Sequence, residues 1–204
     1  MTSPVFPRLG AGCGAVFAIV LFAASGSGSH AYLAPRAIAG SAAIVVAIPF
    51  VVYLCSLLRS AEEGTGWLSG TALAAGVSGI ALKLASEFPA LALHRAHVAD
   101  GTRLHEVFEE MAGGATVLSL YPLAVFCAAT AIVVLRSGVL PRWLGAGAAL
   151  TAAALAVNGC FLEASFVPAL LLFMLWTLLA SVHLLRTSGL AQATVAEARA
   201  TVAA

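Results

Sequence analysis

The chain contains six apolar segments, each about as long as a helix that crosses a lipid bilayer. They lie at about 10–27, 37–58, 67–93, 112–135, 143–162 and 166–185. Roughly 20 apolar residues in a helix span the ~30 Å hydrocarbon core. A segment inside lipid must also satisfy its own backbone hydrogen bonds, which a helix does. The sequence therefore predicts an all-α fold, a polytopic transmembrane bundle of about six helices.

The composition excludes several other classes of protein. Charged residues make up 9% of the chain and hydrophobic residues 61%, whereas about a quarter of a globular chain is charged. Six spans leave no room in 204 residues for a soluble domain, so we predict one transmembrane domain over 1–190 and a short cytoplasmic tail over 191–204. The net charge of +1 offers no basic surplus for nucleic acid. The partner that the composition predicts is the lipid bilayer.

Three apolar segments end in the same way, at Leu58-Arg59-Ser60, Leu135-Arg136-Ser137 and Leu185-Arg186-Thr187. Arginines in short loops mark the cytoplasmic side of a membrane protein. With the N-terminus inside, the inner side holds Arg8, Arg59, Arg136, Arg142, Arg186 and Arg199, and the outer side holds Arg36, Arg95 and Arg103. We therefore predict that both termini are cytoplasmic.

The first apolar segment has a second interpretation. Arg8, the apolar run that follows it and Ala23-Ala24-Ser25 are also typical of a cleaved signal peptide. We favour a retained first helix, and the topology of the other helices is the same in both cases. The four cysteines lie far apart in apolar runs without C-x-x-C spacing, which predicts buried thiols rather than disulfides or a metal site.

The segment Arg136-Ser-Gly-Val-Leu-Pro-Arg-Trp-Leu-Gly145, which precedes an Ala/Leu/Gly-rich span, resembles part of a class of small bacterial membrane proteins of unknown function. The similarity extends more loosely to Arg186, over about the last third of the chain. The first half departs from that pattern. The resemblance implies a six-helix protein of the bacterial inner membrane, and it brings no catalytic residues.

A few polar residues in the spans are predicted to share one layer. They are Lys83 and Glu87 in the third segment, Thr116 and Tyr121 in the fourth, and Asn158 and Glu163 at the end of the fifth. At ~1.5 Å per residue, each lies about 22–30 Å from the arginine-rich side. Polar groups in lipid are costly and therefore mark candidate sites. This layer is the best candidate site in the sequence.

Lys83 and Glu87 are spaced i,i+4 and can pair on one helix face. Gly76 and Gly79 lie on the same face, where they allow a neighbouring helix to approach closely. The pair can join helices, serve transport or proton relay, or act in catalysis. The sequence favours the structural role over the other two.

The loop after the third segment is rich in polar residues. His94, His97, His105 and Glu109 have the i,i+3 and i,i+4 spacings that place zinc or copper ligands together. No H-E-x-x-H motif or paired cysteines accompany them, so a solvated loop is favoured over a metal site. Apolar residues recur with helical spacing from Leu104 to Met111, and Thr102 can cap their first turn. This pattern predicts a short amphipathic helix lying on the outer interface.

The sequence carries no motif of a known reaction, and we expect no cofactor. It favours an integral membrane protein that is not an enzyme and that acts through helix-mediated association, with a second copy or another membrane protein. The alternative is a small proton-coupled or solute transporter that uses Lys83, Glu87 and Asn158. A weaker alternative is an outward-facing metal or enzyme site between His94 and Glu110.

Overall fold

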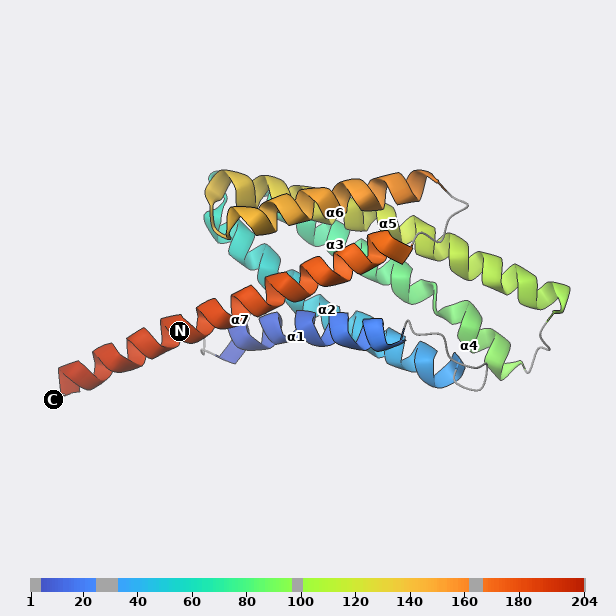
Figure 1. Cartoon of the computed structure of the whole chain (residues 1–204), viewed down its shortest axis with the longest axis horizontal. Coiled ribbons are helices and arrows are strands. Elements are labelled where there is room, and N and C mark those ends of the chain that lie inside the picture. The colour runs from blue at the N-terminus through green and yellow to red at the C-terminus, as the bar shows by residue number, and fades with distance from the viewer. Residues whose placement is uncertain (1–4, 25–32, 97–100, 162–166, 204) are drawn as a thin grey trace.

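The computed structural model consists of α-helices joined by short connections (Figure 1). It describes residues 5–24, 33–96, 101–161 and 167–203, and the side chains of 8–23, 37–96, 101–161 and 168–187. The helices in these residues are α1 (Val5–Ala24), α2 (Leu33–Ala61), α3 (Trp67–Ala85), α4 (Phe88–Arg95), α5 (Arg103–Ser137), α6 (Arg142–Cys160) and α7 (Val167–Ala203). The described residues contain no β-strand. The all-α prediction is confirmed.

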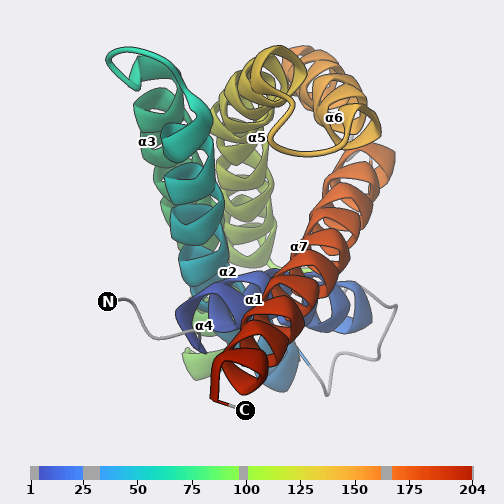
Figure 2. The ribbon, with the colours of Figure 1, turned by 90° about the vertical axis from the view of Figure 1, so that its left-hand side faces the viewer.

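Six of the helices form a ring. Each packs against the next in the order α1, α2, α3, α5, α6, α7, and α7 returns to α1. Figure 2 shows this arrangement from one end of the bundle. The middle of the ring is filled by large buried side chains, among them Phe50, Phe126, Phe173 and Trp176. The core is therefore one continuous apolar centre that all six helices share.

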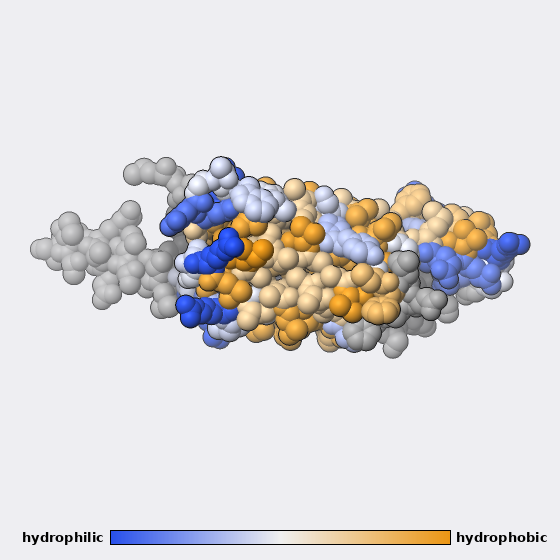
Figure 3. All heavy atoms as spheres, turned by 90° about the horizontal axis from the view of Figure 1, so that it is seen from above, coloured by the Kyte–Doolittle hydropathy of each residue, from blue (hydrophilic) through white to orange (hydrophobic). Residues whose placement is uncertain are grey.

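Five helical segments among the described residues are long and apolar enough to cross a membrane. They are Ala37–Ala61, Trp67–Arg95, Arg103–Ser137, Arg142–Cys160 and Pro168–Thr187, and a shorter apolar helix covers Arg8–Ala23. Figure 3 shows a broad apolar surface between two hydrophilic ends. Exposed large apolar residues on the described helices include Ile19, Leu150 and Leu175. The chain is therefore a multi-pass membrane protein whose helices contact lipid.

Four arginines at or near helix ends gather at one end of the bundle (Figure 1). Arg59 and Arg136 end α2 and α5, Arg142 begins α6, and Arg186 lies on α7, which runs antiparallel to its neighbour α6. We call this the arginine end, and the opposite end the far end. Exposed Trp67 and Trp143 lie at the arginine end, at the depth where indoles meet lipid headgroups. The cytoplasmic location of this end remains a prediction.

The predicted third span, 67–93, corresponds to the candidate span Trp67–Arg95, which consists of two helices. α3 ends at Ala85 and α4 begins at Phe88, with Ser86 and Glu87 between them. Pro89 lies in the first turn of α4 and has no N–H to continue the hydrogen bonds of α3. Glu87 consequently sits at the start of α4 rather than in the middle of a helix.

The predicted short amphipathic helix on the outer interface does not exist as a separate element, so this prediction is wrong. Residues 104–111 form the first turns of α5, a single helix of 35 residues that is about 52 Å long. Gly113 and Gly114 continue the helix instead of ending it. The predicted N-cap is confirmed, because the Thr102 hydroxyl accepts a hydrogen bond from the His105 amide. The start of α5 and α4 project beyond α6 and α7 at the far end (Figure 1).

Glycines allow the helices to approach closely. A Cβ at Gly76 would lie 2.8 Å from Val51 of α2, and one at Gly79 would lie 2.8 Å from Leu123 of α5. The close approach predicted for these two glycines is confirmed. Gly14 of α1 is packed in the same way against Phe50 of α2 and Ser181 of α7. Close approach strengthens the van der Waals packing that holds helices together in lipid.

The thiols are less uniform than predicted. Cys55 and Cys127 are buried and Cys13 is half-buried, but Cys160 at the end of α6 is exposed. All four are free. The prediction of buried thiols is therefore wrong for Cys160.

Candidate functional site

Four polar residues meet near the far end of the ring, and we call them the polar cluster: Lys83, Ser86, Glu87 and Thr116. The Lys83 ammonium lies 3.2 Å from Glu87 Oε1, 3.0 Å from Ser86 Oγ and 3.4 Å from Thr116 Oγ1. An ammonium has three protons to donate. Each therefore has an acceptor, and the lysine of α3 is joined to the start of α4 and to α5.

The helix break creates this cluster. Ser86 and Glu87 lie in the turn between α3 and α4, one helical turn after Lys83. The Ser86 hydroxyl donates to the Lys83 carbonyl at 2.6 Å, and the Glu87 amide donates to the Leu84 carbonyl. These bonds tighten the end of α3 and hold the Ser86 and Glu87 side chains beside the ammonium. The pairing of Lys83 with Glu87 that the spacing predicts is thus present.

The cluster faces neighbouring helices rather than lipid. The side chains of Lys83 and Glu87 are 21% and 20% exposed. The carboxyl carbon and Oε2 of Glu87 lie 3.9 Å from the Cβ position of Gly40, on α2. The two charges therefore lie between α2, α3 and α5. Removing one of them would leave the other poorly solvated and unpaired, which is costly.

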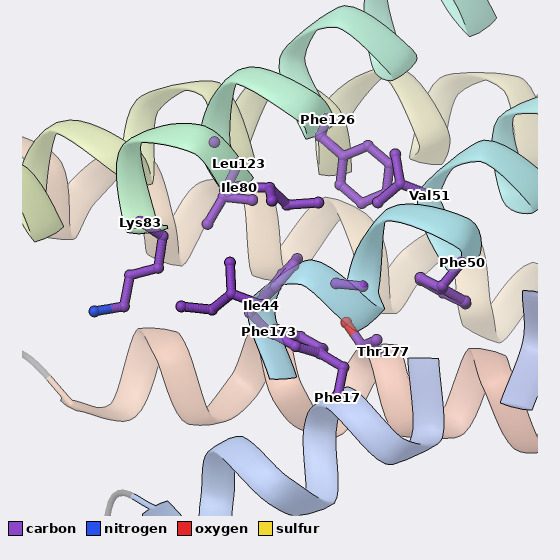
Figure 4. Close-up of a pocket in the computed structure, with 12 residues that line it drawn as sticks. Phe17, Ile44, Phe50, Val51, Ile80, Lys83, Leu123, Phe126, Phe173 and Thr177 are labelled. Carbon is purple, nitrogen blue, oxygen red and sulfur yellow. The ribbon is translucent and has the colours of Figure 1, made fainter. Parts of the chain in front are cut away.

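Lys83 also lines a small cavity in the middle of the ring, which we call the chamber. Its volume is about 30 Å³, and α1, α2, α3, α5 and α7 all contribute to its wall. Figure 4 shows Lys83 at one side of the chamber and the Thr177 hydroxyl among the apolar side chains. The cavity has room for about one water molecule, but its exposed lining is apolar, and apolar cavities stay dry. The polar cluster and the chamber together are the candidate site.

Sequence reasoning missed the hydroxyls in the ring interior. Thr130, Thr177 and Ser181 are buried, and none of the three hydroxyls has a hydrogen-bond partner among the described residues. A helical serine or threonine can instead bond the carbonyl of the preceding turn, as Thr151 does with Gly147. Each missed residue lies in an apolar run, and nothing local predicts that its hydroxyl faces inward.

Tyr121 and Asn158 do not join the polar cluster. Tyr121 lies five residues after Thr116, which rotates it about 140° around α5. The Tyr121 hydroxyl donates to the Gly159 carbonyl of α6, and Asn158 is buried on the same helix. Glu163 lies outside the described residues. Thr116 thus contacts Lys83, whereas Tyr121 lies on a second face of α5 that packs against α6.

The candidate metal ligands are spread over two helices. His94 is exposed near the end of α4, and His105 Nε2 lies 3.2 Å from Glu109 Oε1 on α5. His97 lies outside the described residues. Within the part of the chain that the structure describes, no three His, Cys, Asp or Glu side chains are placed to share a metal ion. The metal site, which includes His97, stays a prediction.

No family model, curated protein or solved structure matches the chain. The resemblance of residues 136–145 to uncharacterised bacterial membrane proteins stays a prediction. Function must therefore be argued from the geometry of the bundle itself.

Proposed function

We propose that this chain is a non-enzymatic component of the bacterial inner membrane that acts as a homodimer formed through α6. The observation that carries the proposal is the exposed surface of α6. Four alanines recur there at spacings of three and four residues, at Ala146, Ala149, Ala153 and Ala156. This spacing keeps them on one stripe of a helix. Small residues on a lipid-facing surface are typical of helix association.

A ridge of large side chains runs beside the alanines. Trp143, Leu150 and Val157 are 52%, 62% and 56% exposed and are spaced by seven residues. Two copies insert in the membrane in the same direction, so a two-fold axis along the membrane normal sets α6 parallel to its copy. That axis places the ridge of each copy against the alanine stripe of the other. The surface is self-complementary, which supports a second copy as the partner.

The test is the oligomeric state of the purified protein in detergent and in nanodiscs. We expect the wild type to be dimeric and to form a covalent dimer through exposed Cys160 on mild oxidation. Ala149→Ile and Ala153→Ile should yield monomers, because a larger side chain fills the stripe. Cys160→Ser should stay dimeric but lose the cross-link.

The matched control is Ala81→Ile, which enlarges an exposed alanine on α3. It should leave the dimer intact. A monomeric wild type, or a dimer that persists in both α6 variants, would contradict the proposal.

A second function, transport of protons or a small solute, is favoured by one observation. Lys83 both lines the chamber and bonds to Glu87, so a change in the pair would alter a cavity at the centre of the ring. The residues that would act are those of the polar cluster, without Asn158. Proteoliposomes with Glu87→Gln should then lose flux while the protein remains inserted. Equal flux in the wild type, Glu87→Gln and empty liposomes would end this alternative.

A further inference from the structure

A second cavity lies at the arginine end, and no function discussed so far uses it. Its volume is about 340 Å³, within the size range of small-molecule sites. It is bounded by the turn between α2 and α3 and by the last turns of α5. We call it the end pocket, and its polar walls come from Glu62, Glu63, Arg136 and Ser137.

The end pocket presents two opposite charges. Glu62 is already engaged, because its carboxylate accepts hydrogen bonds from the Leu68 and Ser69 amides at 3.0 and 2.9 Å and so caps α3. Glu63 and Arg136 are exposed, and neither forms an ion pair or hydrogen bond with another described residue. The Glu63 carboxylate and the Arg136 guanidinium thus line one cavity, and both can bind a ligand there.

The pocket lies at the depth of lipid headgroups. Trp67, which also lines it, is 65% exposed, and tryptophans at helix ends favour the membrane interface. Arg136 ends the membrane-spanning part of α5. A ligand at this depth has its polar group beside these charges.

We propose that the end pocket binds a primary ammonium linked to a phosphate, the chemistry of an ethanolamine phospholipid headgroup. The Arg136 guanidinium matches a phosphate, which it can bind through two parallel hydrogen bonds. The Glu63 carboxylate accepts hydrogen bonds from the ammonium. A choline headgroup has no N–H to donate, and a glycerol headgroup has no positive charge. The pocket therefore distinguishes ethanolamine from the other two.

The proposal is tested by titrating the full-length protein in nanodiscs or detergent with phosphatidylethanolamine, phosphatidylcholine and phosphatidylglycerol, by native mass spectrometry. We expect phosphatidylethanolamine to bind about tenfold more tightly than phosphatidylcholine, the effect of one charge-assisted hydrogen bond. Glu63→Gln should remove this preference. Arg136→Gln should weaken binding of all three lipids.

Two control variants carry the same substitutions outside the pocket. Arg142→Gln changes another exposed arginine at the same end, and Glu110→Gln changes an exposed carboxylate at the far end. Both should keep the preference for ethanolamine. Equal binding of the ethanolamine and choline lipids by the wild type, or an unchanged preference in Glu63→Gln, would overturn the proposal.

Soluble glycerophosphoethanolamine distinguishes the two sources of this headgroup. If it displaces the lipid, and Glu63→Gln prevents its binding, the site takes the free compound as well. If it does not compete, the ligand is the lipid. The α6 dimer proposal fails or holds separately, because its test measures mass rather than lipid preference.

Discussion

Replacing Gly14 by alanine tests whether α1 closes the ring. The added Cβ would contact the Ser181 hydroxyl of α7 and lie 2.5 and 2.7 Å from two ring carbons of Phe50. Phe50 is 2% exposed and Ser181 is 0% exposed, so neither has free space into which to move. Overpacking of this kind costs about 1–3 kcal/mol.

The matched control is Gly12→Ala on the same helix. A Cβ at Gly12 meets no atom within 4 Å. Alanine is favoured over glycine inside a helix by about 1 kcal/mol, so this variant should be slightly more stable than the wild type. The same gain applies to Gly14→Ala, where the overpacking offsets it. The two variants should therefore differ by about 1–3 kcal/mol, which is about 2–12 °C in Tm for a chain of this size.

Thermal unfolding can be followed with a thiol-reactive fluorescent dye in detergent. Buried Cys55 and Cys127 react only when the bundle opens, whereas exposed Cys160 reacts at the start and sets the baseline. Gly14→Ala should unfold at the lower temperature. Equal Tm values for the two variants would refute the packing of α1 against α2 and α7.

Three further predictions concern polar contacts. Lys83→Met and Glu87→Gln should each lower the stability by about 1–3 kcal/mol, which is less than the loss expected when a fully buried ion pair is broken. The double variant should recover most of this loss. If the two losses simply add in the double variant, measured in the same dye assay, the pairing is refuted. Burial alone would raise the pKa of Glu62, but hydrogen bonds from Ser69 and Leu68 and the charge of Arg59 hold it below its ordinary value of 4.5. The Glu62 contribution to stability is therefore full above pH 4.5 and lost as the pH falls through the lower folded pKa, so Glu62→Gln should flatten this acid limb in Tm measurements across pH. Thr102→Ala should speed hydrogen exchange in the first turn of α5 without shifting the Tm, because it removes an N-cap worth about 1 kcal/mol locally.

The helices and their membrane setting follow from the amino-acid sequence alone. Their cause is local, since a run of about 20 apolar residues must form a helix in lipid wherever it packs. The pairing of Lys83 with Glu87 was equally predictable, because an i,i+4 spacing brings two side chains together on any helix. The signal for the break was also present at Pro89, although the length of the apolar run hid it.

Which helices are neighbours, and which side chains face the centre, depends on how the helices pack in three dimensions. Thr116 contacts Lys83, which lies 33 positions earlier in the sequence. Ser181 of α7 packs against Gly14 of α1, near the other end of the sequence. Apolar runs in lipid are hydrophobic on every side, so their sequences carry weak information about which face turns inward. By residue counting Tyr121 shares a depth with the polar cluster, but it lies on another face of α5, where its hydroxyl bonds to α6. The depth of a residue follows from counting along one helix, whereas the direction in which its side chain points depends on how several helices pack.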